Sequence, residues 1–412
     1  MTNQPQAQRP QQPLSLWELV PVADYRPPPT PATRAARERW ASLKRLFGKR
    51  REDQKPARAE SDLQGLSEGR LESLVGPVAW EPGAEALGEA LTARGAGDGV
   101  AFVVGPPRAG HAALLQCWAT REGARRIEPP AYRDILDGGA DWLEDWPSDA
   151  GSWTLPRLEC CLLRHADGLA LVRELLDRAL SGRLGRGVIG CDSWAWAYLR
   201  QVAAVPTHSA LALQALDGER LAALLRSLVA SDEPRPVRFR NAQSGKLLLA
   251  VDGEENAEDD GGGGQLESLA AHCRGIGGLA RELWRGRLRA EPEPETAGDN
   301  GAVDPDAATR EDNDARETVW VAAAAEEPAL AADGDEEPAL VLHALLLHNG
   351  LPGPLLTELL PLPPFRVQAT LHRLAAAGFI AFAETGHWGV TAAGYVPARG
   401  LLQAQGLLVD DF

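Results

Sequence analysis

One eight-residue stretch limits the fold of this chain more than any other: Gly105-Pro106-Pro107-Arg108-Ala109-Gly110-His111-Ala112, directly after the apolar run Val100–Val104. A short apolar run predicts a buried strand, and residues 110–120 that follow predict a helix. Glycines in a strand-to-helix turn let backbone amides point inward, and the helix N-terminus adds its dipole. We therefore expect an α/β core that contains a loop of the anion-binding kind.

The loop resembles the AAA+ form of the Walker A motif, G-P-P-x-x-G-K-[ST]. Both glycines and both prolines match, but His111 replaces the lysine and Ala112 replaces the Ser or Thr. The resemblance implies a P-loop NTPase fold with ATP or ADP as the ligand. Without the lysine and the hydroxyl, we expect neither tightly held Mg²⁺ nor efficient ATP hydrolysis. The residues that the resemblance places at the nucleotide are Gly105, Arg108, Ala109, Gly110, His111, Ala112 and Ala113.

Three further residues match later landmarks of the same superfamily. Glu159, after the apolar segment Trp153–Leu155, takes the place of the water-activating carboxylate, although Leu158 replaces the preceding acid. Ser193 follows the next strand at the sensor position. Arg274, or alternatively Arg281, lies beside a glycine-rich turn where a lid arginine contacts the γ-phosphate. Each has a structural alternative, because Glu159 also suits a helix first turn, Ser193 also suits a helix cap, and Arg274 also suits solvent. We predict no metal site, because no His lies at ligand spacing beside a Cys pair.

Strand and helix patterns alternate over residues 71–230, which predicts a parallel sheet with right-handed crossovers. Residues 231–290 predict a hairpin and two helices broken at residues 275–278, a helical lid. Residues 336–412 predict three helices and a hairpin, the order of a winged helix-turn-helix domain. The expected fold class is α/β, a P-loop NTPase sheet with a lid and a winged helix. Residues 1–70 are expected to be a disordered tail with a basic amphipathic helix, and 291–335 an acidic linker.

The order of these parts resembles the origin-recognition and STAND branches of the AAA+ superfamily. In those branches nucleotide sets a conformational switch, and the winged helix binds DNA or packs on the core. The resemblance implies a regulatory switch or scaffold that acts through its winged helix. Two alternatives stay open: a DNA-binding transcriptional regulator, and an active ATPase in which Arg108 or another cation replaces the lost lysine.

Charge disfavours the DNA reading. The chain carries a formal net charge of −16, but residues 338–412 hold only 3 Arg against 4 Asp or Glu. The expected recognition helix, residues 364–377, has Arg366, His372 and Arg373 as its cationic candidates. Because phosphate neutralisation supplies much of the affinity for DNA, this segment is poorly suited to it. A protein partner, or self-association through the winged helix, is the expected partnership.

The N-terminal region carries the opposite charge. Residues 1–58 hold 12 Lys or Arg against 5 Asp or Glu. The pattern of Arg34–Arg51 predicts a basic helix, which either faces solvent or contacts an acidic partner or a membrane surface. The apolar patch Leu14–Val20 suits docking onto a partner or onto the chain's own core.

Five cysteines without CxxC spacing predict reduced thiols. No secretory signal or 18-residue apolar run is present, so we expect a cytoplasmic protein, at most peripheral to the inner membrane.

Overall fold

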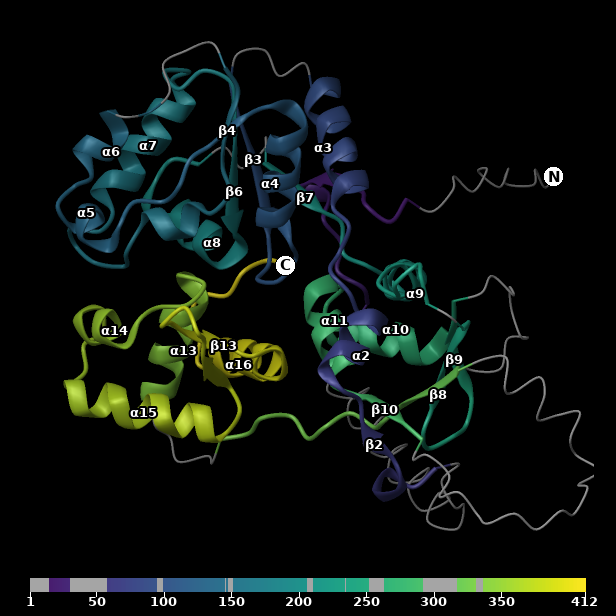
Figure 1. Ribbon diagram of the computed structural model, residues 1–412. Coiled ribbons are helices and arrows are strands. Elements are labelled where there is room, and N and C mark those ends of the chain that lie inside the picture. The colour runs from purple at the N-terminus through teal and green to yellow at the C-terminus, as the bar shows by residue number, and fades with distance from the viewer. Residues whose placement is uncertain are drawn as a thin grey trace, which may run out of the picture.

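The computed structural model describes three parts that pack around a common centre (Figure 1). They are a core sheet with its helices, a second sheet with its helices, and a C-terminal helical unit that comprises residues 336–412. The described residues are 15–29, 58–94, 99–144, 146, 151–205, 210–233, 235–251, 263–291, 317–330 and 336–412.

The core sheet has the strand order β1-β7-β3-β6-β5-β4. All neighbouring strands are parallel except β1, which pairs antiparallel with β7. The strands are β1 (Leu19–Pro21), β3 (Val100–Gly105), β4 (Arg125–Arg126), β5 (Trp153–Leu155), β6 (Gly187–Asp192) and β7 (Ala210–Leu213). Strand β3, which leads into the glycine-rich loop, lies in the interior of the sheet and is apolar and buried, as its sequence predicts.

Helices cover both faces of this sheet. Val103 points to the face covered by α3 (Glu81–Ala93) and α4 (His111–Glu122), whereas the neighbouring Phe102 contacts Trp196 of α8 (Ser193–Val202), with ring centroids 5.5 Å apart. The adjacent strands β3 and β6 thus send their following helices to opposite faces. Such a switch point opens a crevice at the carboxyl ends of the strands, where α/β proteins place their ligands. Helices α5 (Tyr132–Leu136), α6 (Ala140–Glu144) and α7 (Ala170–Leu180) complete this part.

The N-terminal patch is part of the core, so the expectation of a disordered tail is wrong for residues 15–29. Leu19 pairs with Leu213 across β1 and β7, and Gln214 donates a backbone hydrogen bond to the carbonyl of Glu18. Residues 58–70 are also folded, with a short strand and the start of a helix. The proposed basic helix Arg34–Arg51 lies outside the described residues.

The second sheet has the order β2-β10-β11-β8-β9. The hairpin β8 (Val237–Asn241) and β9 (Leu247–Ala250) was expected, but it belongs to this five-stranded sheet and is not an insertion into a helical lid. Strand β11 (Glu317–Val321) pairs parallel with β8, although its residues were assigned to the acidic linker. The remaining elements are β2 (Gln64–Gly65), β10 (Leu288–Ala290), α2 (Glu68–Leu74), α9 (Gly218–Ser227), α10 (Gly263–His272) and α11 (Gly277–Arg285).

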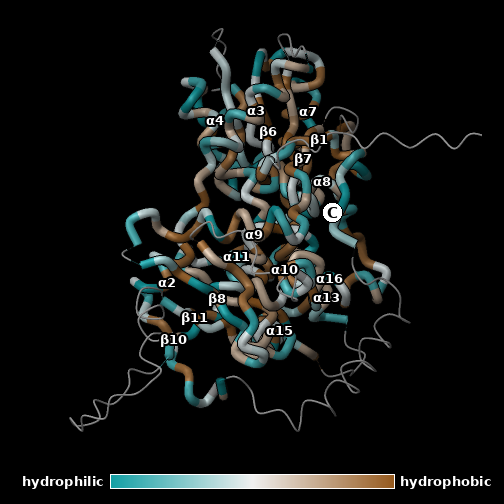
Figure 2. The backbone as a smooth tube through the Cα atoms, turned by 90° about the vertical axis from the view of Figure 1, so that its right-hand side faces the viewer, coloured by the Kyte–Doolittle hydropathy of each residue, from teal (hydrophilic) through white to brown (hydrophobic). Residues whose placement is uncertain are grey.

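Helices α10 and α11 are broken at Gly275, as predicted, and Figure 2 shows them with α9 beneath the core strands β6 and β7. The C-terminal unit has the predicted order of three helices and a hairpin, followed by a fourth helix. Its elements are α13 (Glu337–Leu347), α14 (Gly353–Leu359), α15 (Pro364–Ala376), β12 (Ile380–Phe382), β13 (Trp388–Val390) and α16 (Ala392–Ala404). No helix among the described residues is long and apolar enough to cross a bilayer.

Candidate functional site

The loop after β3 turns sharply into α4. Arg108 adopts a φ of 68° and Gly110 a φ of 87°, the left-handed region that glycine tolerates best. The Ala109 amide donates to the Pro106 carbonyl at 3.0 Å, which closes the turn. Helix α4 begins at His111, so Ala112 and Ala113 form its first turn. The backbone therefore has the strand–loop–helix course that the sequence predicts.

The interior of this turn holds the His111 side chain. A Cβ atom on Gly105 would stand 2.9 Å from Nδ1 of His111, so the imidazole lies against the end of β3. The ring is buried, and neither nitrogen has a hydrogen-bond partner among the described residues. Burial lowers the pKa of His111, with the nearby Arg157 acting in the same direction and Glu159 opposing it. The ring is consequently neutral at pH 7 and does not replace the charge of a lysine.

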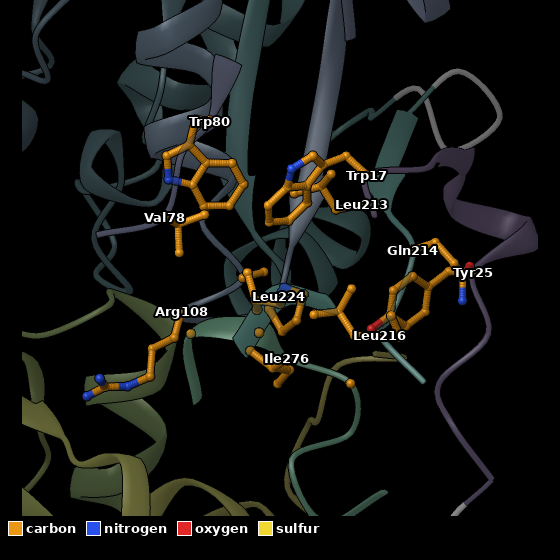
Figure 3. Close-up of a pocket in the computed structure, with 16 residues that line it drawn as sticks. Trp17, Tyr25, Val78, Trp80, Arg108, Leu213, Gln214, Leu216, Leu224 and Ile276 are labelled. Carbon is orange, nitrogen blue, oxygen red and sulfur yellow. The ribbon is translucent and has the colours of Figure 1, made fainter. Parts of the chain in front are cut away.

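An indole covers the outer side of the loop. A Cβ atom on Gly110 would stand 2.1 Å from the Trp80 ring, so the two residues are in direct contact. Trp80 packs on Trp17 of the N-terminal segment, with ring centroids 4.7 Å apart (Figure 3). The cavity beside them has a volume of about 50 Å³. That volume admits a few water molecules, whereas small-molecule pockets have roughly 300–1,000 Å³.

The N-terminus of α11 closes the same loop from another direction. The Gly278 amide donates to the carbonyl of Arg108 at 3.2 Å, and a Cβ atom on Gly278 would stand 2.2 Å from that oxygen. Only a glycine allows this approach, because a side chain would separate the two backbones. The glycine-rich turn thus provides a backbone contact between the second sheet's helices and the loop.

The side chain of Arg108 leaves the loop toward the C-terminal unit, as Figure 3 shows. Its guanidinium forms an ion pair with Glu282 of α11 and donates to the carbonyl oxygen of Val390 of β13 at 2.9 Å. One loop residue therefore connects the core, α11 and the C-terminal unit. In this structure the cation that could have replaced the missing lysine is bound to protein groups.

Glu159 lies in a 3-10 turn, Leu158–Cys161, ahead of α7, and not in the first turn of an α-helix. The intervening loop returns at Gly168, whose Cβ position is blocked by the Leu163 carbonyl at 2.6 Å. Glu159 is buried and accepts hydrogen bonds from the Asp192 amide at 3.1 Å and from Arg157 at 3.3 Å. These bonds hold the carboxylate at the ends of β5 and β6.

Asp192 supplies a second buried carboxyl group beside Glu159. Its Oδ1 caps α8 by accepting from the Trp194 amide at 3.1 Å, and its Oδ2 has no partner among the described residues. Burial and the neighbouring Glu159 raise the pKa of Asp192 well above its usual value. A protonated Asp192 would relieve the repulsion between the two carboxyl groups.

Ser193 and Arg274 both form hydrogen bonds with the segment 407–412, in which the sequence predicted no functional residue. The Ser193 hydroxyl donates to the buried Asp410 carboxylate, and Arg274 donates through Nε to the carbonyl oxygen of Phe412 at 2.8 Å. The segment 407–412 therefore lies along the carboxyl ends of the core strands, where Figure 1 marks the C-terminal end. Both predicted nucleotide contacts are occupied by this segment.

The residues present do not fit Mg-ATP in this arrangement. The His111 side chain fills the loop, the Trp80 ring covers Gly110, and the side chain of Ala112 has no oxygen that could bind a metal. Among the described residues, no cluster of three or more His, Cys, Asp or Glu could hold a metal ion. All five cysteines are free thiols.

Sequence reasoning missed Trp17, Trp80, Asp410 and Phe412. The apolar patch around Trp17 was visible as a docking segment, but its target was not. The run Leu407–Phe412 carries a signal in the sequence, because an aromatic residue directly follows two adjacent acids.

Neither protein-family models nor curated protein sequences match this chain. Among solved structures, it is similar to the RuvB Holliday junction branch migration motor of Thermotoga maritima, with 14% identity, a TM-score of 0.29, and coverage of 84% of this chain and 96% of that one. It is also similar to a Signal Transduction ATPase with Numerous Domains with a tetratricopeptide repeat sensor from Pyrococcus horikoshii, with 11% identity and a TM-score of 0.26. The match covers 84% of this chain and 44% of that one. TM-scores this low do not establish a common fold, so the α/β description rests on the strand order and the loop.

Proposed function

We propose that this chain is a regulatory protein of the AAA+/STAND type that does not hydrolyse ATP. Its degenerate phosphate loop serves as a joint that holds the C-terminal unit against the core. The C-terminal unit acts as a winged helix that binds a protein partner when the joint opens. ATP or ADP, without tightly held Mg²⁺, is a ligand for the open form alone, because the closed form has no room for it.

One observation carries this proposal: Arg108 bonds both Glu282 and the Val390 carbonyl. A loop that binds phosphate needs its donors directed inward. Here the loop's cation is directed outward and contacts two other parts of the molecule. Any ligand that draws Arg108 back into the loop would break both contacts, which couples the loop to the position of the C-terminal unit.

The surface of the C-terminal unit favours a protein partner over DNA. Phe365 at the start of α15 is 72% exposed, and Phe382 of β12 is 59% exposed. Arg366, one of the few cations of α15, forms an ion pair with Glu337 at 2.6 Å. Exposed aromatic residues mark protein interfaces, whereas a DNA-binding face requires several cations free to meet phosphates.

Amide hydrogen exchange tests the joint. We expect Arg108→Ala to speed exchange in residues 388–390 and 277–280 about tenfold, since a hydrogen bond from a charged donor contributes about 1.5 kcal/mol or more. The matched control is Arg121→Ala, which removes an ion pair with Glu85 of α3 at the end of α4 remote from the loop.

The control should leave exchange in both segments unchanged. Equal exchange in the Arg108→Ala and wild-type chains would show that the loop does not hold the C-terminal unit, and the proposed joint would be wrong.

A further inference from the structure

Residues 407–412 are held in the way that a bound peptide is held. Beyond Leu407, whose amide donates to the Leu402 carbonyl, these residues form no strand or helix. Side chains of the core, of the turn before α11 and of the preceding helix α16 make the contacts instead. The residues that surround the segment are Tyr25, Ser193, Arg200, Arg274 and Arg399.

Charge complementarity runs along this groove. Asp410 is buried and forms an ion pair with Arg399, which also donates to the Asp410 carbonyl at 2.6 Å. Asp411 pairs with Arg200 of α8 at 2.7 Å. A buried carboxylate is costly unless it is both paired and hydrogen-bonded, so the groove is specific for an acid at the position of Asp410.

An aromatic contact follows the two acids. The ring of Phe412 packs on Tyr25 with centroids 4.5 Å apart, and the backbone oxygen of Phe412 accepts from Arg274. Phe412 is 3% exposed. The groove therefore recognises three consecutive residues: a buried acid, a second acid at the rim, and an aromatic anchor.

We propose that this groove is a recognition site for a partner protein that carries an Asp-Asp-aromatic segment, and that residues 407–412 occupy it as an intramolecular competitor. A partner peptide must displace a segment attached to the same molecule, which has the advantage of a high effective concentration. Gly406, with a φ of 70°, lies at the point where the segment leaves α16. This inference concerns the contacts of residues 407–412 and not those of Arg108 with Glu282 and Val390, and it does not depend on the absence of ATP hydrolysis.

A labelled peptide with the sequence of residues 407–412, Leu-Leu-Val-Asp-Asp-Phe, tests the proposal by fluorescence anisotropy. The receptor is the full chain with Asp410→Asn, Asp411→Asn and Phe412→Ala. These substitutions weaken the binding of its own residues 407–412 to the groove. We expect this variant to bind the peptide at least tenfold more tightly than the wild-type chain does. A peptide of the same composition in permuted order should bind neither chain.

A charge exchange checks the register without disturbing the core. Arg200→Glu should weaken binding of the peptide several-fold, and a peptide with Asp411→Lys should recover it. Arg183→Glu is the control, because Arg183 pairs with Asp177 on α7 and is exposed. If the triple variant does not fold, Phe412→Ala alone serves as the receptor, since it keeps both acids.

Equal binding of the ordered and permuted peptides, or no gain over the wild-type chain in a folded variant, would overturn the proposal. A wild-type dimer that the peptide disperses would also overturn it, because the occupant would then be a second copy of this chain. The joint proposed above is unaffected by either result, since its test measures exchange at residues 388–390.

Discussion

The guanidinium of Arg108 donates a hydrogen bond of 2.9 Å to the carbonyl oxygen of Val390, a residue of the hairpin that lies 282 positions further along the chain. The same guanidinium pairs with Glu282. A loop whose sequence resembles a phosphate-binding motif thus makes its charged contacts with the protein itself. In the proposed function the loop has a structural role, which does not need the lysine and hydroxyl that turnover requires.

Gly110→Ala is expected to destabilise the chain by about 3 kcal/mol, as the sum of backbone strain at positive φ and a clash with the Trp80 ring. Gly123→Ala is the matched control: Gly123 also has a positive φ, but nothing lies within 4 Å of its Cβ position. It should cost about 1 kcal/mol. Chemical denaturation measures both, and equal losses would show that Trp80 does not press on the loop.

Phosphate release from Mg-ATP should not exceed the background for the wild-type chain. Glu159, the predicted water-activating residue, is engaged by the Asp192 amide and by Arg157. The comparison is with Glu159→Gln, which should release phosphate at the same background rate. Turnover that this substitution abolishes would restore the alternative of an active ATPase and refute the structural role of the loop.

Much of the fold was predictable because it follows local patterns. Apolar periodicity and glycine positions predict the buried strand before the loop, the break at Gly275 and the helix order of residues 336–412. Strand β11 was not, because its five residues follow a long acidic stretch and pair only with distant β8 and β10. Pairing between remote segments leaves no periodic signal near either one.

The candidate site was predicted as a set of residues but not as a set of contacts. That His111 and Ala112 make the loop differ from a functional Walker A motif stays a prediction from the sequence. Nothing local indicated that Trp80 covers Gly110, or that Ser193 and Arg274 meet residues 410 and 412. Those contacts depend on where the N-terminal and C-terminal segments return to the core, which only the tertiary structure decides.

The docking of the C-terminal unit should weaken in acid. His343 and His348 of this unit are buried beside Arg164 of the core; burial lowers the pKa of His343 to about 4 and that of His348 to about 3. The unfolded chain therefore binds protons more readily. Their contribution to stability is complete above about pH 6.5, and falls by about 1.4 kcal/mol per pH unit for each histidine as the pH drops toward 4.

Urea unfolding at pH 7 and pH 5 measures this effect. The double substitution His343→Gln and His348→Gln should flatten the difference between the two pH values. His372→Gln, at an exposed position of α15, should leave the difference as in the wild-type chain. If the double variant keeps the wild-type difference in unfolding free energy between pH 7 and pH 5, groups other than these two histidines cause that difference.

The most direct test of the closed loop is calorimetric titration of ATP into the full chain, with and without Mg²⁺. His111 inside the turn, Trp80 over Gly110 and a cavity of about 50 Å³ leave no room for a nucleotide. In the proposed account only the open form binds nucleotide and the closed form predominates, so we predict no binding heat for the wild-type chain up to millimolar ATP. Micromolar binding that Gly110→Glu or Arg108→Ala weakens would contradict this account, and would show that the loop is a working nucleotide site.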